Sequence, residues 1–156
     1  VNLRGPRDDG GWQLEAEACQ KAGITLFDFT ARSRAAPSKA MLHAAKSLFA
    51  EIEKPVLMHC KSGADRAGLM AALYLLVAEN QPASVALRQL AWKYGHIKAA
   101  KTGLLDVFFA AYLPYEKEGM AFYHWVDEIY DPEQLATEFQ AQGWAVRLTD
   151  TILRRE

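Results

Sequence analysis

The chain has 156 residues, of which 51% are hydrophobic and 24% charged, and its formal net charge is −1. This balance is typical of one compact domain and excludes a disordered polyelectrolyte. It provides no overall basic field of the kind that binds nucleic acid, so no nucleic-acid partner is expected.

The two cysteines, Cys19 and Cys60, argue against a disulfide scaffold and against a four-cysteine zinc site. We expect no metal and no other cofactor, and we interpret Cys19 as a packing residue. The most apolar run, 69–78, is too short to span a bilayer as a helix. No signal peptide is recognisable, so the sequence predicts a cytoplasmic location, where a thiol stays reduced.

In chain order, short apolar runs alternate with amphipathic segments through the first half. Three runs rich in β-forming residues predict strands: 1–3, 24–29 and 55–59. Helical spacing of apolar residues predicts three helices: 12–22, 38–52 and 67–79. Gly23 is a typical residue after a helix end, and Ser38 is a good N-cap.

The second half shows only helical patterns, over roughly 83–94, 103–113, 121–129, 132–142 and 149–155. The order of elements predicts an α/β fold: a small, mostly parallel sheet flanked by helices, with a helical C-terminal half. We expect a single domain over 1–156, in which about 96–156 form a helical extension packed on the rest. The sequence leaves the oligomeric state open.

The segment between the third strand and the third helix, 59–68, carries the chemistry. A strand-to-helix junction directs backbone N–H groups and the positive helix end at one point, which favours an anion. Gly63 allows the backbone to curl closely around a ligand. Cys60 begins this curl, where its thiolate would be stabilised. Arg66 supplies a planar fork that binds two phosphate oxygens.

His59-Cys60-x5-Arg66 after an apolar strand resembles the signature of the cysteine-dependent protein tyrosine and dual-specificity phosphatases. The resemblance covers about 1–95 and implies a dual-specificity-phosphatase-like fold. It also implies that Cys60 attacks phosphorus to form phosphocysteine, that Arg66 binds the phosphoryl oxygens and that His59 tunes the cysteine. The implied phosphate-binding residues are Lys61, Ser62, Gly63, Ala64, Asp65 and Arg66.

The chain departs from the family's pattern at the residue after the arginine. The family has Ser or Thr there, whose hydroxyl helps the thiolate to leave when water attacks the intermediate. Ala67 cannot donate that hydrogen bond. We therefore expect slow breakdown of the intermediate unless Ser62 or a water molecule compensates.

A second departure concerns the general acid, which the family places in the loop after the preceding strand. Here that loop, 30–37, contains no acid, and Ala35 marks either a natural loss or an engineered one. Asp65 is one substitute, since the myotubularin lipid phosphatases have an aspartate there; its alternative is a carboxylate that organises the loop. Asp28 has a suitable spacing but lies on the predicted strand.

Basic residues are expected around the mouth of the site. Lys61, Arg32 and Arg34 lie in two loops that should converge, and lysine at this place also resembles phosphatases acting on inositol lipids. The basic segment 93–103 is a candidate further wall of the site. Its His96 could contact substrate or cap a helix end, and we favour the cap.

The sequence predicts an enzyme that hydrolyses phosphomonoesters on a protein, lipid or sugar. Two alternatives stay open: a phosphate-binding pseudophosphatase, and a cysteine enzyme of the rhodanese or arsenate reductase type. Arg154 and Arg155 are a weak indication of peripheral contact with a membrane.

Overall fold

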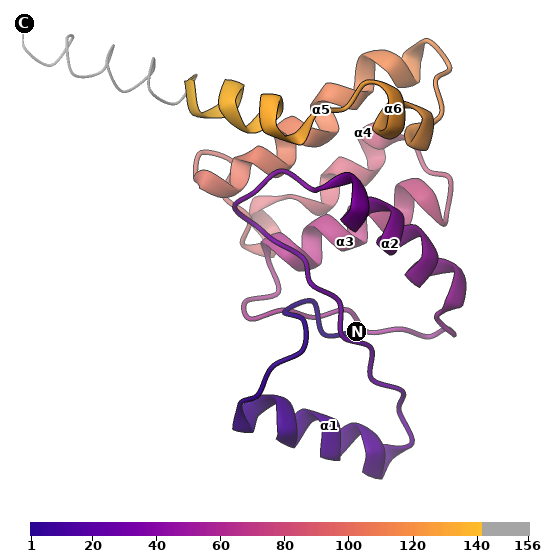
Figure 1. Cartoon of the computed structure of the whole chain (residues 1–156), viewed down its shortest axis with the longest axis vertical. Coiled ribbons are helices and arrows are strands. Elements are labelled where there is room, and N and C mark those ends of the chain that lie inside the picture. Colours follow the sequence, from indigo (N-terminus) through magenta and orange to yellow (C-terminus); the bar gives the residue numbers. More distant parts are fainter. Residues whose placement is uncertain (142–156) are drawn as a thin grey trace, which may run out of the picture.

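The computed structural model describes residues 1–141, which are built largely from helices (Figure 1). The α-helices are α1 (Gly10–Ala22), α2 (Lys39–Glu51), α3 (Asp65–Val77), α4 (Ala83–Ala86), α5 (Leu104–Lys117) and α6 (Phe122–Glu128). Three 3₁₀ turns are η1 (Leu87–Gln89), η2 (Trp92–Tyr94) and η3 (Lys101–Gly103). Residues 132–141 are also helical. The predicted helix at 149–155 lies outside the described residues.

The ends of the first two helices follow from local chemistry, and both predicted signals are confirmed. Gly23 ends α1 with a left-handed backbone (φ 67°), and the Asp9 side chain caps the start by accepting the Trp12 N–H. The Ser38 hydroxyl accepts the Met41 N–H at 3.2 Å and so caps α2.

The predicted mostly parallel sheet is wrong, because residues 1–141 contain no β-strand. The three segments predicted as strands meet only through isolated bridges: Asn2 with Asp28 and with His59, both parallel, and Arg4 with Thr30, antiparallel. The short segment that contains Asn2 lies between the other two and turns away at Gly5 (φ 77°). It is therefore too short to form the successive pairings that make a ladder.

The single helix predicted for 83–94 is also wrong, since the chain there forms α4, η1 and η2 in succession. Leu90 is buried and leaves helical geometry, and Ala91 is extended. A Cβ on Gly68 of α3 would lie 3.0 Å from the Gln89 carbonyl oxygen. The chain therefore follows α3 at close range instead of continuing as a regular helix.

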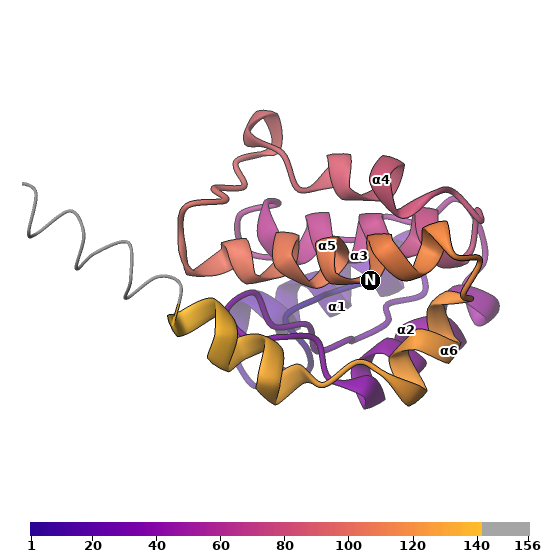
Figure 2. The ribbon, with the colours of Figure 1, turned by 90° about the horizontal axis from the view of Figure 1, so that it is seen from above.

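The hydrophobic core surrounds α3, which is apolar on all sides as the sequence predicts. Helices α2 and α4 pack against α3, while α5 packs against α4 and α6 (Figure 2). The second half adds a cluster of aromatic side chains in mutual contact: Phe108, Phe109, Tyr112, Phe122, Trp125 and Tyr130. These contacts hold α5 and α6 together.

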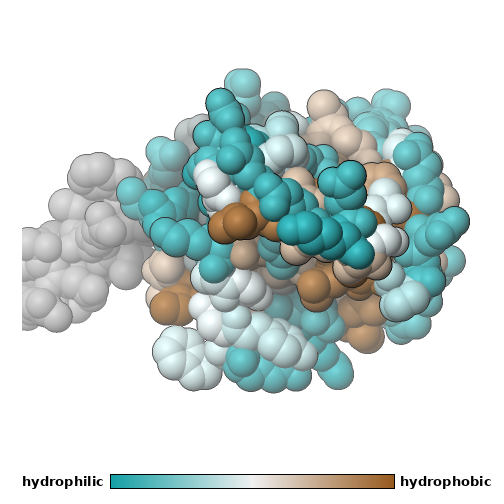
Figure 3. Space-filling view, turned by 90° about the horizontal axis from the view of Figure 1, so that it is seen from below, coloured by the Kyte–Doolittle hydropathy of each residue, from teal (hydrophilic) through white to brown (hydrophobic). Residues whose placement is uncertain are grey.

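Helix α1 lies apart from this core, at the bottom of Figure 1, and buries none of its residues. Seen from that side, the surface mixes apolar and polar side chains (Figure 3). The large apolar residues exposed in this part of the chain are Leu14, Ile24 and Leu57. Polar contacts, rather than apolar burial, join α1 to the rest.

Candidate active site

The segment from Cys60 to Arg66 curls between the His59 bridge and the start of α3. Gly63 adopts a left-handed backbone (φ 71°), which glycine tolerates without strain. Ala64 occupies the N-cap position of α3 and provides no side-chain acceptor. The amides at the start of the helix therefore stay available for another acceptor.

The Cys60 sulfur is such an acceptor. Burial alone would raise the pKa of its thiol, but backbone N–H groups of Ser62, Ala67 and Gly63 donate hydrogen bonds to the sulfur, and Arg66 adds a positive charge. Together these interactions hold the pKa of Cys60 below its ordinary value. The site thus favours a thiolate, which is the nucleophilic form of cysteine.

A cavity of about 570 Å³ opens above this sulfur. It is lined by Ala31, Arg32, Ser33, Arg34, Ala35, Cys60, Lys61, Ser62, Asp65 and Arg66. Two segments expected to converge therefore do meet. Ala35 faces the cavity from the loop that lacks an acid, and the acidic side chain among these lining residues is Asp65.

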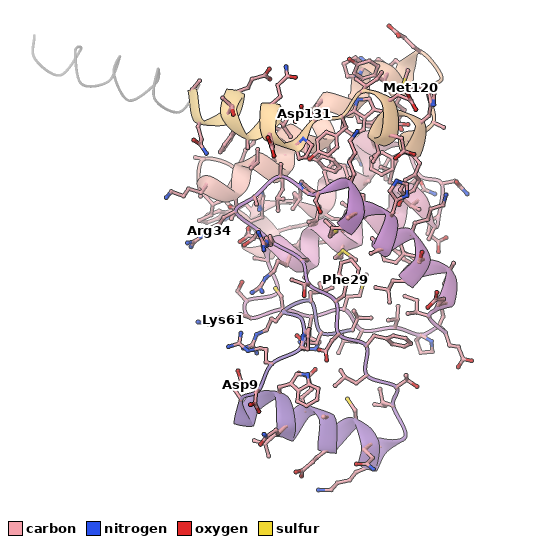
Figure 4. All side chains as sticks on the ribbon, viewed as in Figure 1. Asp9, Phe29, Arg34, Lys61, Met120 and Asp131 are labelled. Carbon is pink, nitrogen blue, oxygen red and sulfur yellow. The ribbon has the colours of Figure 1, made fainter. Side chains whose placement is uncertain are left out.

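Positive charge dominates the cavity wall. Arg32 and Arg34 come from one loop, and Lys61 and Arg66 from the other. In Figure 4, Arg34 and Lys61 project on the same side of the molecule from these two segments. Four cations against one carboxylate give a strong local attraction for anions, although the net charge of the chain is −1.

Two predicted supporting residues do not line the cavity. The His59 ring contacts Glu15 of α1, with Nε2 to Oε1 at 2.5 Å. The Asp28 carboxylate accepts hydrogen bonds from the Asn2 amide at 2.8 Å and from the Trp12 indole at 3.0 Å. Both side chains join the first helix to the bridged segments rather than facing the site.

His96 is the site residue whose contacts the sequence did not reveal. Instead of capping a helix end, its ring is buried and bonded on both sides, Nδ1 to Asp65 at 2.8 Å and Nε2 to Asp106 at 2.6 Å. Burial alone would lower the pKa of His96, but the bonds to Asp106 and Asp65 outweigh it and raise the pKa. An aspartate in the otherwise apolar start of α5 was the available signal of a buried polar partner.

Among residues 1–141, no group of three or more His, Cys, Asp or Glu side chains is placed to hold a metal ion. None of the helices in this same part of the chain has the length and apolar character needed to cross a membrane.

Comparison with known proteins agrees with this geometry. The profile of the tyrosine phosphatase family matches residues 13–87, which include the whole Cys60–Arg66 loop. Dual specificity protein phosphatase TpbA of Pseudomonas aeruginosa, in strains UCBPP-PA14 and PAO1, is 49% identical over 41 residues. That alignment covers 26% of this chain and 19% of each relative, so the chain matches about a fifth of their length. No solved structure matches.

The chain is thus related to the cysteine-dependent tyrosine and dual-specificity phosphatases, and the resemblance inferred from the sequence is confirmed. This family consists of enzymes whose substrates are phosphorylated.

Proposed function

We propose that this chain hydrolyses phosphomonoesters through a phosphocysteine intermediate on Cys60. The observation that carries the proposal is the Cys60 sulfur, ringed by three backbone N–H donors and Arg66 at a cationic cavity. Sulfur attacks phosphorus, and the bond from phosphorus to the leaving oxygen breaks. Water then attacks the phosphocysteine, so that inorganic phosphate leaves and the thiolate is restored.

Arg66 and the loop amides balance the charge of the transferred phosphoryl group. The guanidinium presents two parallel donors to two phosphoryl oxygens, while the loop amides that do not donate to the Cys60 sulfur face the remaining one. Donors that are already directed at the site before the reaction stabilise the transition state most effectively. These assignments rest on the loop's curl at Gly63 and on the cavity that it borders.

The structure reduces the number of candidate general acids that could protonate the leaving oxygen. Asp28 is engaged by Asn2 and Trp12 away from the cavity, whereas Asp65 lines it. The leaving oxygen therefore takes its proton either from Asp65 or from water.

Ala67 makes the second step slow. Its N–H donates to the Cys60 sulfur, but its methyl group offers no hydroxyl to stabilise the departing thiolate. We expect a rapid burst of leaving group followed by slow steady turnover. A protein that binds phosphate without any burst would instead be a pseudophosphatase.

The substrate is a phosphorylated protein, lipid or sugar. Arg32, Arg34 and Lys61 surround the phosphate position with more positive charge than one phosphoryl group requires. Substrates that carry further negative charge near the scissile phosphate should therefore bind more tightly than a simple aryl phosphate.

The test uses an aryl phosphate and three variants. Cys60→Ser should abolish both the burst and turnover, while Cys19→Ser, the matched control in α1, should leave both unchanged. Arg66→Ala should weaken inorganic phosphate binding by about 10–100-fold, as expected for charge-assisted hydrogen bonds. Hydrolysis by Cys60→Ser at the parent rate would refute the mechanism.

A further inference from the structure

His96 joins two helices that the chain separates widely. One ring nitrogen contacts Asp65 at the first position of α3, and the other contacts Asp106 in the first turn of α5. The His96 side chain is 1% exposed and that of Asp106 is 8% exposed, while Asp65 is 24% exposed and reaches the cavity. The three side chains thus run from the interior to the site.

The hydrogen bonds among Asp65, His96 and Asp106 determine the charge state of this cluster. An ionised carboxylate only accepts hydrogen bonds, and a neutral imidazole carries one N–H. With both carboxylates ionised, a neutral His96 would place a nitrogen lone pair against an oxygen lone pair at 2.6 or 2.8 Å. An imidazolium satisfies both contacts with charge-assisted hydrogen bonds, and the raised pKa of His96 agrees with that form.

We propose that His96 is a positioning residue of the phosphate-binding loop: its imidazolium, backed by the buried Asp106 carboxylate, holds Asp65 as a fixed carboxylate. The proposal rests on the proposed function only in taking this loop as the catalytic one.

The backbone around His96 is closely packed, so the ring cannot easily move away. A Cβ on Gly95 would lie 3.5 Å from the Ala64 side chain, which places the segment directly against the loop. A Cβ on Gly103 would lie only 1.9 Å from the Lys98 carbonyl oxygen, which shows how tightly the chain turns before α5. The segment therefore presents His96 to Asp65 in a fixed position.

The contacts of His96 with Asp65 and Asp106, called the clamp from here on, also define the role of Asp65. One Asp65 oxygen already accepts the His96 N–H at 2.8 Å, so this side chain is held by the ring instead of being free to deliver a proton to the leaving oxygen. Asp65 also separates Ala64 from Arg66, so fixing its side chain fixes the first turn of α3 and the base of the arginine. Asp65 is then a positioning residue, and the leaving oxygen takes its proton from water.

The clamp also lowers the electrostatic cost of a carboxylate beside a phosphate. With His96 charged, the three side chains sum to −1; without its proton they sum to −2. The charged groups that face the ring are Asp65 from α3 and Asp106 from α5. Lys93, Lys98 and Lys101 of the same segment are exposed. Loss of the proton should therefore weaken anion binding.

The first test needs no substrate and no substitution in the cluster. Nitrogen NMR of the imidazoles, assigned by the substitutions His43→Gln, His59→Gln and His124→Gln outside the cluster, should show that His96 keeps both ring protons to a pH clearly above the ordinary value of about 6.5. His124, which is exposed, serves as the internal reference. A His96 titration near the ordinary value of about 6.5 would overturn the clamp.

The second test follows inorganic phosphate affinity with pH. Asp106→Asn keeps the shape but removes the buried counter-charge, so His96 should lose its proton at lower pH. The ratio of variant to parent affinity should fall by about 10-fold between pH 6 and 8.5, as expected for loss of one charged hydrogen bond. Ionisation of phosphate and of Cys60 affects both proteins and largely cancels in the ratio.

The matched control breaks a histidine–carboxylate contact outside the site. His43 and Asp127 meet at 2.7 Å, and both side chains are half-exposed. Asp127→Asn should leave the ratio flat, and a flat ratio for a folded Asp106→Asn would overturn the proposal. If the phosphatase assay fails while His96 still keeps both ring protons above a pH of about 6.5, the proposed function falls and the role of His96 stands.

Discussion

The second half of the chain and α1 are held in opposite ways. In the second half, aromatic rings pack edge to face, as in Phe108 against Phe122, and Phe108 is fully buried. In α1 no residue is buried, and the polar contacts of Trp12 and Glu15 attach the helix. Apolar burial contributes far more to stability than such half-exposed polar contacts.

The candidate site lies at the junction of these two regions. Its arginine side belongs to α3, which the core surrounds, whereas its cysteine side follows the bridge between Asn2 and His59. The anion-binding geometry therefore depends on the stable helical region, which holds Arg66 and the first turn of α3. The weakly attached α1 should be able to loosen without destroying the loop.

The largest expected effect is in the aromatic cluster. Phe108→Ala removes a fully buried ring and leaves a cavity, so the free energy of unfolding should fall by about 3–5 kcal/mol. Denaturant unfolding measures this loss. Leu14→Ala in α1 is the control; Leu14 is 69% exposed, so its effect should stay within about 0.5 kcal/mol. Equal losses for the two variants would contradict the contrast between the regions.

The sequence predicted best the features that depend on local chemistry. Gly23 marked the end of α1 and Ser38 the start of α2, and the all-apolar pattern of α3 identified the central helix. The Asp9 cap starts α1 at Gly10, two residues before the predicted start at 12. The sequence of the Cys60–Arg66 loop also indicated its family, because its cysteine, glycine and arginine serve one anion.

Features that depend on contacts between distant parts of the chain could not be predicted from the sequence. Apolar runs such as 55–59 predicted strands, yet the number of successive pairings depends on how long the neighbouring segment lies beside them. His96 was interpreted as a helix cap because Asp65 and Asp106 lie 31 and 10 residues away along the chain. Asp28 kept a plausible spacing to Cys60 although Asn2 and Trp12 occupy its carboxylate.

A smaller effect should appear in the pH dependence of stability. The folded state raises the pKa of His96, so protonation stabilises the fold fully below the unfolded value of about 6.5. That stabilisation should disappear as pH rises through the raised pKa. Urea unfolding of the parent should therefore show declining stability above neutral pH.

Asp106→Asn provides the comparison for that pH profile. Removing the Asp106 carboxylate, which lies 2.6 Å from His96 Nε2, should flatten the decline in the free energy of unfolding, because less proton binding is then linked to folding. A parent profile that rises with pH through the same window would have the wrong sign. It would indicate that another group controls stability there.

The smallest effect concerns the attachment of α1. Trp12→Phe keeps an aromatic ring but removes the indole N–H that contacts both oxygens of Asp28 at 3.2 and 3.0 Å. Because this contact is exposed, its loss should cost at most about 1 kcal/mol. Local opening of α1 should nevertheless increase, since few other contacts hold the helix.

Hydrogen exchange measures that opening separately from global unfolding. Amides of α1 should exchange several-fold faster in Trp12→Phe, while amides of α3 should keep their protection. Trp92→Phe is the matched control, because Trp92 is 77% exposed and lies in η2. Faster exchange in α3 as well would mean that α1 and the loop open as one unit. Asp28 does not line the cavity, so phosphate binding should be unchanged in Trp12→Phe. That result would show that the contact between Trp12 and Asp28 attaches α1 and does not support the phosphate site.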